Sequence, residues 1–198
     1  MQCCPGYVVF LVIPPQPSPS RFSCISQWIA NEWGGELALK GVVRADEAVR
    51  ALDHGFTAIW ISNHGGRQLE TSVPTINVLP EIRAAVGNDV EIVIDGGIMR
   101  GTDIAKAIAL GADAVGCGKA YLYGLAAGGK PGVAKAVHIL EDELKRAMGL
   151  LGCRTVEELK RDGPALIRKI NGDNSHMQYL ADRIKPPAPK KVKVAATQ

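Results

Sequence analysis

Residues 90–97 read Val-Glu-Ile-Val-Ile-Asp-Gly-Gly. Four of the first five residues are β-branched and apolar, which is typical of a strand buried on both faces of a parallel sheet. An aspartate and two glycines then end the strand, as at the turn from a strand into a helix. We therefore interpret this stretch as a central parallel strand whose carboxyl end carries polar and glycine residues.

Three other segments repeat this organisation. Short apolar runs at 37–40, 58–62 and 114–117 are each closed by a polar or glycine residue at or directly after their end, and helix-like patterns separate the four runs. Strands that alternate with helices form a parallel sheet, either doubly wound or closed into a (β/α)8 barrel. We expect the four strands, which end at Lys40, Ser62, Asp95 and Cys117, to lie side by side in that order.

Composition limits the class of protein. The chain has 198 residues, of which 46% are hydrophobic and 22% charged, close to the average of globular domains. A mainly disordered chain is therefore excluded, and no apolar run reaches the ~18–20 residues of a membrane span. Aromatic residues make up only 5%, which favours an α/β domain over an all-β sandwich.

Charge is distributed unevenly along the chain. The net charge is +3, but residues 1–172 carry 18 Lys/Arg and 18 Asp/Glu, so the body is neutral and lacks the basic surface of a nucleic-acid-binding domain. We expect a flexible basic tail at 171–198. Its Lys-rich stretch 185–193 leaves a nuclear-localisation signal or an anionic-surface patch as alternatives.

The first 27 residues differ from the rest. They contain four closely spaced prolines, and no basic residue precedes the apolar run 7–13, so a signal peptide is not expected. We treat 1–27 as an atypical segment and 28–170 as the domain.

The odd cysteine count and irregular spacing predict neither a disulfide framework nor a zinc site, and favour a reducing compartment such as the cytosol. The five are Cys3, Cys4, Cys24, Cys117 and Cys153.

Each expected strand end carries residues that bind or react. Lys40 ends the first strand, Ser62 ends the second and His64 follows it, Asp95 ends the third, and Lys119 follows the fourth. Ligands of parallel α/β sheets bind at the carboxyl ends of the strands. We therefore expect one shared ligand site at this edge of the sheet.

Glycines after two consecutive strands indicate a phosphate cradle. Backbone N–H groups at glycine approach an anion closely, and a helix expected to begin near Thr102 would add its positive end. Two ordinary strand–helix turns are the alternative. A Rossmann dinucleotide site is disfavoured because no Gly-x-Gly-x-x-Gly follows a strand. The cradle residues are Gly96, Gly97, Arg100, Gly118 and Lys119.

His64 and Arg67 share the loop after the second strand. Histidine is a general base near neutral pH, and an arginine binds a carboxylate through two parallel hydrogen bonds. Lys40 at the same mouth can stabilise a developing anion. The combination indicates chemistry at a carbon next to a carboxylate.

Several spaced motifs in one order resemble the FMN-dependent 2-hydroxy-acid oxidases and dehydrogenases, the family of glycolate oxidase, lactate oxidase, mandelate dehydrogenase and flavocytochrome b2. The resemblance covers about residues 28–169. It is carried by Leu39-Lys-Gly41, Ser62-Asn-His-Gly-Gly-Arg-Gln-Leu69, Asp95-Gly-Gly-Ile-Met-Arg-Gly-Thr-Asp103, Lys106-Ala-Ile-Ala-Leu-Gly-Ala112, Tyr121-Leu-Tyr-Gly-Leu-Ala126 and Gly152-Cys-Arg154.

The resemblance implies a role for each site residue. His64 is the base that takes a proton from a small 2-hydroxy acid such as lactate or glycolate, and Arg67 binds the carboxylate of that substrate. Lys40 lies by the N1/O2 edge of FMN and stabilises the reduced anionic ring, and Ser62 touches the flavin. The ribityl and phosphate region is held by Asp95, Gly96, Gly97, Ile98 and Met99, with Gly118 and Lys119 completing the phosphate grip.

Two features depart from the family pattern. Arginine is usual where Met99 and Lys119 stand, which weakens the expected phosphate grip. The family fold is a (β/α)8 barrel of roughly 250 residues, whereas the four strands expected here correspond to its strands 5 to 8, so we expect a partial barrel.

A non-catalytic remnant that acts as an interaction module remains the alternative. A second copy or a complementing half-barrel is the expected protein partner. The loop of His64 and Arg67 argues against a type 2 isopentenyl-diphosphate isomerase.

Overall fold

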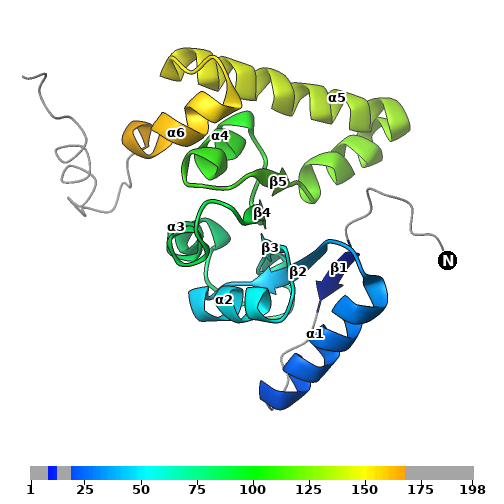
Figure 1. Ribbon diagram of the computed structural model, residues 1–198. Helices are drawn as coiled ribbons and strands as arrows, with labels where there is room; N and C mark the ends of the chain where they lie inside the picture. The colour runs from blue at the N-terminus through cyan, green and yellow to red at the C-terminus, as the bar shows by residue number, and fades with distance from the viewer. Residues whose placement is uncertain (1–8, 13–18, 168–198) are drawn as a thin grey trace, which may run out of the picture.

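The computed structural model describes residues 9–12 and 19–167. The expected tail at 171–198 lies outside the described residues. Strands and helices alternate along the chain (Figure 1) in the order β1 (Val9–Val12), α1 (Pro19–Trp33), β2 (Leu37–Val42), α2 (Ala45–Asp53), β3 (Ala58–Ile61), η1 (His64–Gly66), α3 (Thr75–Val86), β4 (Glu91–Asp95), α4 (Gly101–Ala109), β5 (Ala114–Gly116), α5 (Lys119–Leu151) and α6 (Val156–Leu166).

Five strands form one parallel sheet in the order β1-β2-β3-β4-β5. The predicted order of four adjacent parallel strands is confirmed by β2 to β5. The sheet contains one strand more than expected, because residues 9–12 pair with residues 37–40 of β2. Helix α1 continues without a break through residue 28, where composition suggested that the domain begins. The atypical segment thus supplies a strand and much of a helix.

The core lies between the sheet and the helices α2, α3 and α4, which follow one side of the sheet in Figure 1. Alternate residues of the central strands point toward these helices and are fully buried, among them Ile59, Ile61 and Ile92. Residues between them, such as Trp60 and Asp95, point to the opposite, inner face. This period of two directs polar residues near the strand ends toward a common side.

Helix α5 consists of two arms that meet at Gly128 and Gly129, both outside helical backbone angles. The arms touch backbone to backbone, because a Cβ at Gly132 would overlap the carbonyl group of Gly124. The second arm packs on α4, and α6 packs on α4 as well. No helix in the described part of the chain is long and apolar enough to cross a membrane.

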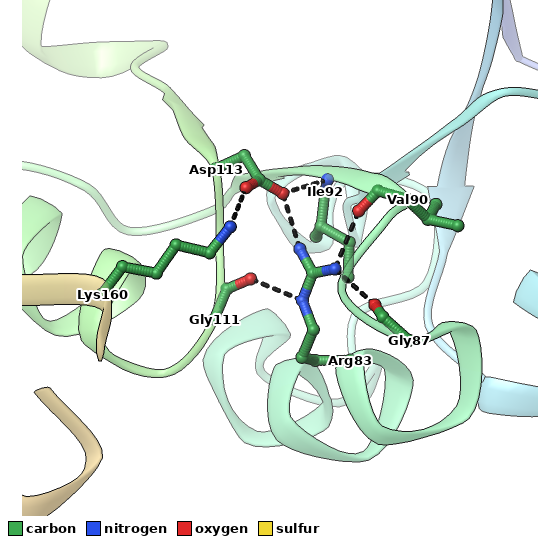
Figure 2. Close-up of polar contacts among 7 residues, drawn as sticks. All are labelled: Arg83, Gly87, Val90, Ile92, Gly111, Asp113 and Lys160. Atoms are coloured by element: carbon green, nitrogen blue, oxygen red, sulfur yellow. Dashed lines mark hydrogen bonds and ion pairs between the residues drawn. The ribbon is translucent and has the colours of Figure 1, made fainter. Parts of the chain in front are cut away.

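Arg83 of α3 lies buried beneath the amino ends of β4 and β5, and only 9% of it is exposed. Its guanidinium donates hydrogen bonds to three backbone carbonyl oxygens (Figure 2). They belong to Gly87 at 2.6 Å, Val90 at 2.7 Å and Gly111 at 2.8 Å. One side chain therefore satisfies the backbone of both turns that enter these strands.

Asp113 completes this network. Its carboxylate accepts a hydrogen bond from Arg83 at 2.6 Å and one from the N–H of Ile92 at 2.8 Å, and it pairs with Lys160 of α6. Partial burial works to raise the pKa of Asp113, but these donors outweigh burial, and the pKa lies below its ordinary value. The network ties α3, β4, β5 and α6 together at the end of the sheet away from the predicted site.

Candidate functional site

Lys40, Ser62 and Asp95 meet at the carboxyl ends of β2, β3 and β4. The ammonium of Lys40 donates to Ser62 Oγ at 2.9 Å and lies 2.9 Å from Asp95 Oδ2. Ser62 Oγ donates in turn to Asp95 Oδ1 at 2.6 Å. Lys40 and Asp95 are 55 positions apart in the sequence, and with Ser62 they form one closed network across three strands.

The burial of this network differs from residue to residue. Ser62 is only 1% exposed, whereas the side chains of Lys40 and Asp95 are 21% and 19% exposed. The Ser62 hydroxyl also accepts the backbone N–H of His64 at 3.1 Å, so its donor and both acceptor positions are used. The network therefore fixes the start of the following loop as well as the lysine.

His64 has an unusual backbone conformation, and its φ of 55° makes it the one non-glycine residue with positive φ in the described part of the chain. The side chain of Asn63 helps to hold this turn by accepting the N–H of Gly65 at 3.0 Å. The Nε2 atom of His64 is enclosed and has no hydrogen-bond partner among the described residues. A buried, unpaired nitrogen is costly and calls for an explanation, of which a catalytic role is one.

The His64 ring lies against β2, directly beyond Lys40. A Cβ built on Gly41 would come within 2.9 Å of His64 Cε1. Arg67 follows in the same loop and is exposed, with no ion-pair partner in the part of the chain that the structure describes. The loop thus carries a base that lies against Gly41, next to Lys40 in the chain, and an exposed cation three residues further on.

The glycines after β4 and β5 leave open backbone. Apart from the two flanking residues, no atom of the described residues lies within 4 Å of the position that a Cβ would occupy on Gly97 or Gly118. Gly96 is required for a different reason, because a Cβ there would meet Thr75 Oγ1 at 2.9 Å, and its φ is +101°. Thr75 itself donates to the carbonyl oxygen of Asp95 at 2.6 Å. The turn is therefore rigid at Gly96 and accessible at Gly97.

The N-terminus of α4 is occupied by side chains of the protein. Asp103 accepts the N–H groups of Met99 and Arg100 at 3.2 and 3.0 Å, and Glu143 of α5 accepts the N–H of Gly101 at 2.9 Å. The Arg100 guanidinium pairs with Glu143 at 2.9 Å. Arg100 and the first amides of α4 are thus engaged with carboxylates, and the accessible part of the expected cradle is Gly97, Gly118 and the start of α5.

The remaining predicted residues lie around these glycines. Ile98 is 7% exposed and belongs to the core, so its contribution to a site is its backbone. The side chain of Met99 is 39% exposed, and Lys119 is exposed at the first position of α5. The predicted residues are gathered at one end of the sheet, and the roles of each toward a flavin and a substrate stay predictions.

Trp60 is a site residue that the sequence analysis did not identify. Its Nε1–H donates to Asp95 Oδ2 at 3.0 Å, and its ring centroid lies 5.4 Å from Lys40 Nζ. The period of two along β3 places Trp60 on the same face as Ser62, which is the signal that could have revealed it.

The model of the family described as FMN-dependent dehydrogenase matches residues 21–166. The chain belongs to this family. Its curated relatives include L-lactate oxidase from Nostoc sp., 47% identical over 67% of this chain and 36% of that protein. Pre-mycofactocin synthase from Mycobacterium tuberculosis is 44% identical over 73% of this chain and 40% of that protein. 2-Hydroxyacid oxidase 1 from Mus musculus is 43% identical over 72% of this chain and 40% of that protein.

Solved structures agree with this membership. A crystal structure of mandelate oxidase with 3,3-difluoro-2-hydroxy-3-phenylpropionic acid matches with a TM-score of 0.68 and 42% identity, over 70% of this chain and 42% of that one. The predicted fold class is thereby confirmed as part of a (β/α)8 barrel, with five strands in place of about four. The chain spans about two fifths of the length of the curated relatives that it matches.

The described residues fit the flavin that the family uses. The glycine backbone at residues 97 and 118 is open to a phosphate oxygen, and Lys119 supplies a cation beside it. On β2, away from these glycines, Lys40 presents an ammonium that suits the negatively charged edge of a flavin ring. The Nε2 of His64, an unpaired hydrogen-bonding atom, lies against Gly41, the residue that follows Lys40.

Proposed function

We propose that this chain carries the FMN site and the catalytic residues of an oxidoreductase that converts a small 2-hydroxy acid into the 2-oxo acid. The unpaired Nε2 of His64 beside the network of Lys40, Ser62 and Asp95 carries this proposal. The relatives act on different substrates by name, so the choice of a 2-hydroxy acid rests on His64 and Arg67.

Oxidation of a 2-hydroxy acid removes two protons and two electrons. When bound, FMN would supply the acceptor for the two electrons and for the second proton. His64 takes a proton from the substrate at Nε2, and the exposed guanidinium of Arg67 binds the substrate carboxylate. Lys40, held by Ser62 and Asp95, places a positive charge where negative charge develops.

The phosphate grip that we propose is weaker than the family pattern. The open backbone at Gly97 and Gly118 and the charge of Lys119 support phosphate binding, whereas Met99 supplies no charge and Arg100 is paired with Glu143. We therefore expect weak FMN binding and slow turnover by this chain alone.

The test measures FMN binding and reduction of the flavin, and does not depend on steady-state product formation. The full chain is titrated with FMN by fluorescence, and the complex is mixed anaerobically with lactate or glycolate while flavin absorbance is recorded. We expect bleaching of the flavin that His64→Ala abolishes. His138→Ala is the matched control, because the His138 side chain is 67% exposed on α5. Failure to bind FMN, or equal bleaching by His64→Ala, would contradict the proposal.

A non-catalytic interaction module is the second candidate. Exposed apolar side chains on the first arm of α5 favour it, with Tyr121 42%, Leu122 47% and Tyr123 61% exposed. A second copy of the chain or a complementing half-barrel is the protein partner that we propose for either function. Sedimentation velocity over a range of concentrations tests the second copy, and a monomer at every concentration rejects it.

A further inference from the structure

Trp60 lies in a row of residues that crosses the inner face of the sheet just below the strand ends. It stands opposite Lys40 in the register of β2 and β3, and Asp95 stands opposite Gly116 in the register of β4 and β5. The indole joins the two pairs, because its Nε1–H donates to Asp95 Oδ2 at 3.0 Å while its ring centroid is 5.4 Å from Lys40 Nζ.

Gly116 provides the space for this arrangement. A Cβ on Gly116 would come within 2.9 Å of Trp60 Cζ2 and within 3.2 Å of Asp95 Cβ. The indole therefore reaches from β3 past Asp95 to β5, and a side chain on β5 would push it away. A large aromatic residue on β3 and a glycine on β5 form a complementary pair.

Asp95 Oδ2 is shared by two donors, the ammonium of Lys40 and the Nε1–H of Trp60. The lysine side chain is long and flexible, so its charge is fixed in space only if its partners are fixed. The indole holds the carboxylate from one side and offers its ring face to the ammonium from the other.

We propose that Trp60 is a positioning residue for Lys40, acting through the Asp95 carboxylate and through the face of its own ring. This inference rests on the proposed function, in which the Lys40 ammonium must lie where negative charge develops. It adds to that function a structural reason for the direction in which the ammonium points, set by Trp60 and Gly116 before any ligand binds.

The test measures Lys40 in the full chain without FMN. The rate of acetylation of Lys40 by acetic anhydride is followed by mass spectrometry and divided by the rates at Lys106 and Lys145, whose side chains are 57% and 68% exposed. We expect the normalised rate to rise roughly three- to tenfold in Trp60→Leu, because this variant loses one hydrogen bond and one cation–π contact. The rise should be smaller in Trp60→Phe, which keeps an aromatic ring.

Two further variants separate positioning from general damage. Gly116→Ala, which displaces the indole without removing it, is expected to raise the normalised Lys40 rate as well. Trp28→Phe is the matched control, because Trp28 is 65% exposed, and we expect no change. Unfolding would also raise the normalised Lys40 rate, because Lys106 and Lys145 are already exposed in the folded chain. Circular dichroism therefore checks that each variant is folded, and Trp60→Phe decides if Trp60→Leu does not fold.

An unchanged normalised rate in a folded Trp60→Leu, or an equal rise in Trp28→Phe, overturns the inference. FMN titration of the same variants distinguishes this result from failure of the proposed function. If Trp60→Leu frees Lys40 and also weakens FMN binding about tenfold, both stand. If Lys40 responds while no variant, nor the unchanged chain, binds FMN, the positioning stands and the proposed function fails.

Discussion

The imidazole of His64 lies directly against Gly41, so that a single added carbon on Gly41 would come within 2.9 Å of the ring. The glycine after Lys40 thereby sets how close the predicted base comes to the strand that carries the predicted cation. Gly41 also has a φ of +103°, so both its backbone and its lack of a side chain are used.

Gly41→Ala is expected to push the His64 ring out of its enclosed position. The variant should lose about 1–2 kcal/mol of stability from the strained backbone. It should also make His64 react faster with diethyl pyrocarbonate, relative to the exposed His138, as followed by mass spectrometry. Gly55→Ala is the control, because Gly55 has a φ of +88° and a Cβ there meets only Ala30 at 3.5 Å. Equal effects on His64 in both variants would contradict the contact.

Arg83→Met is expected to cost about 3–5 kcal/mol of the free energy of unfolding. The change leaves the carbonyl groups of Gly87, Val90 and Gly111 without their donor and Asp113 without one buried partner. Urea unfolding followed by circular dichroism measures the loss. Arg161→Met removes an exposed pair with Asp162 and should change stability by less than about 1 kcal/mol. A loss of that small size in Arg83→Met would show that the network contributes little.

The stability of the fold depends on pH through Asp113. Its pKa is lowered in the folded chain, so its contribution is fully present above the unfolded value of about 3.9 and disappears as the pH falls through the folded pKa. The stability difference between the unchanged chain and Asp113→Asn should therefore be constant from about pH 7 to pH 5 and shrink below about pH 4. Urea unfolding at each pH measures it, with Asp89→Asn as an exposed control. A difference that grows on acidification would contradict this sign.

The close contact between α4 and α5 predicts opposite effects at two glycines. A Cβ on Gly101 would overlap backbone of α5 at Glu143 and Leu144, so Gly101→Ala should force the helices apart and lower the melting temperature. Gly149 has open space at its Cβ position inside α5, so Gly149→Ala should stabilise the chain by about 0.5–1 kcal/mol. Calorimetry of both variants checks the pair, and a stabilised Gly101→Ala would contradict the packing.

Much of this fold follows from local sequence. The runs around Ile59 and Ile92 are β-branched and apolar and end on polar residues, so their strands, order and parallel direction are predictable from spacing alone. The strand at residues 9–12 is not predictable in this way. Its apolar run is followed by prolines in place of the polar or glycine residue that closes the other four runs, so the sequence does not mark it as a strand of the same sheet.

The site divides in the same manner. Lys40, Ser62 and Asp95 are visible in the sequence because they stand at successive strand ends, and polar residues at several strand ends in register indicate a site. Glu143 is invisible there, since its contact with the N–H of Gly101 arises only when α5 folds back onto α4. The helix expected near Thr102 begins at Gly101, but carboxylates of the protein already accept N–H groups at its start, and the open backbone lies at Gly97.

Met99 stands at a position where the family usually carries arginine. Met99 is 39% exposed and follows the open backbone of Gly97, so Met99→Arg would place a guanidinium beside the proposed phosphate site. One added charge-assisted hydrogen bond should tighten FMN binding about tenfold or more. Riboflavin, which has the same ring and no phosphate, should bind unchanged, and the gain for FMN should shrink as salt is raised. Met99→Leu controls for the change of side chain without charge. Fluorescence titration of both flavins measures the difference, and an equal gain for riboflavin would place the new charge at the ring instead of the phosphate and contradict the cradle at Gly97 and Gly118.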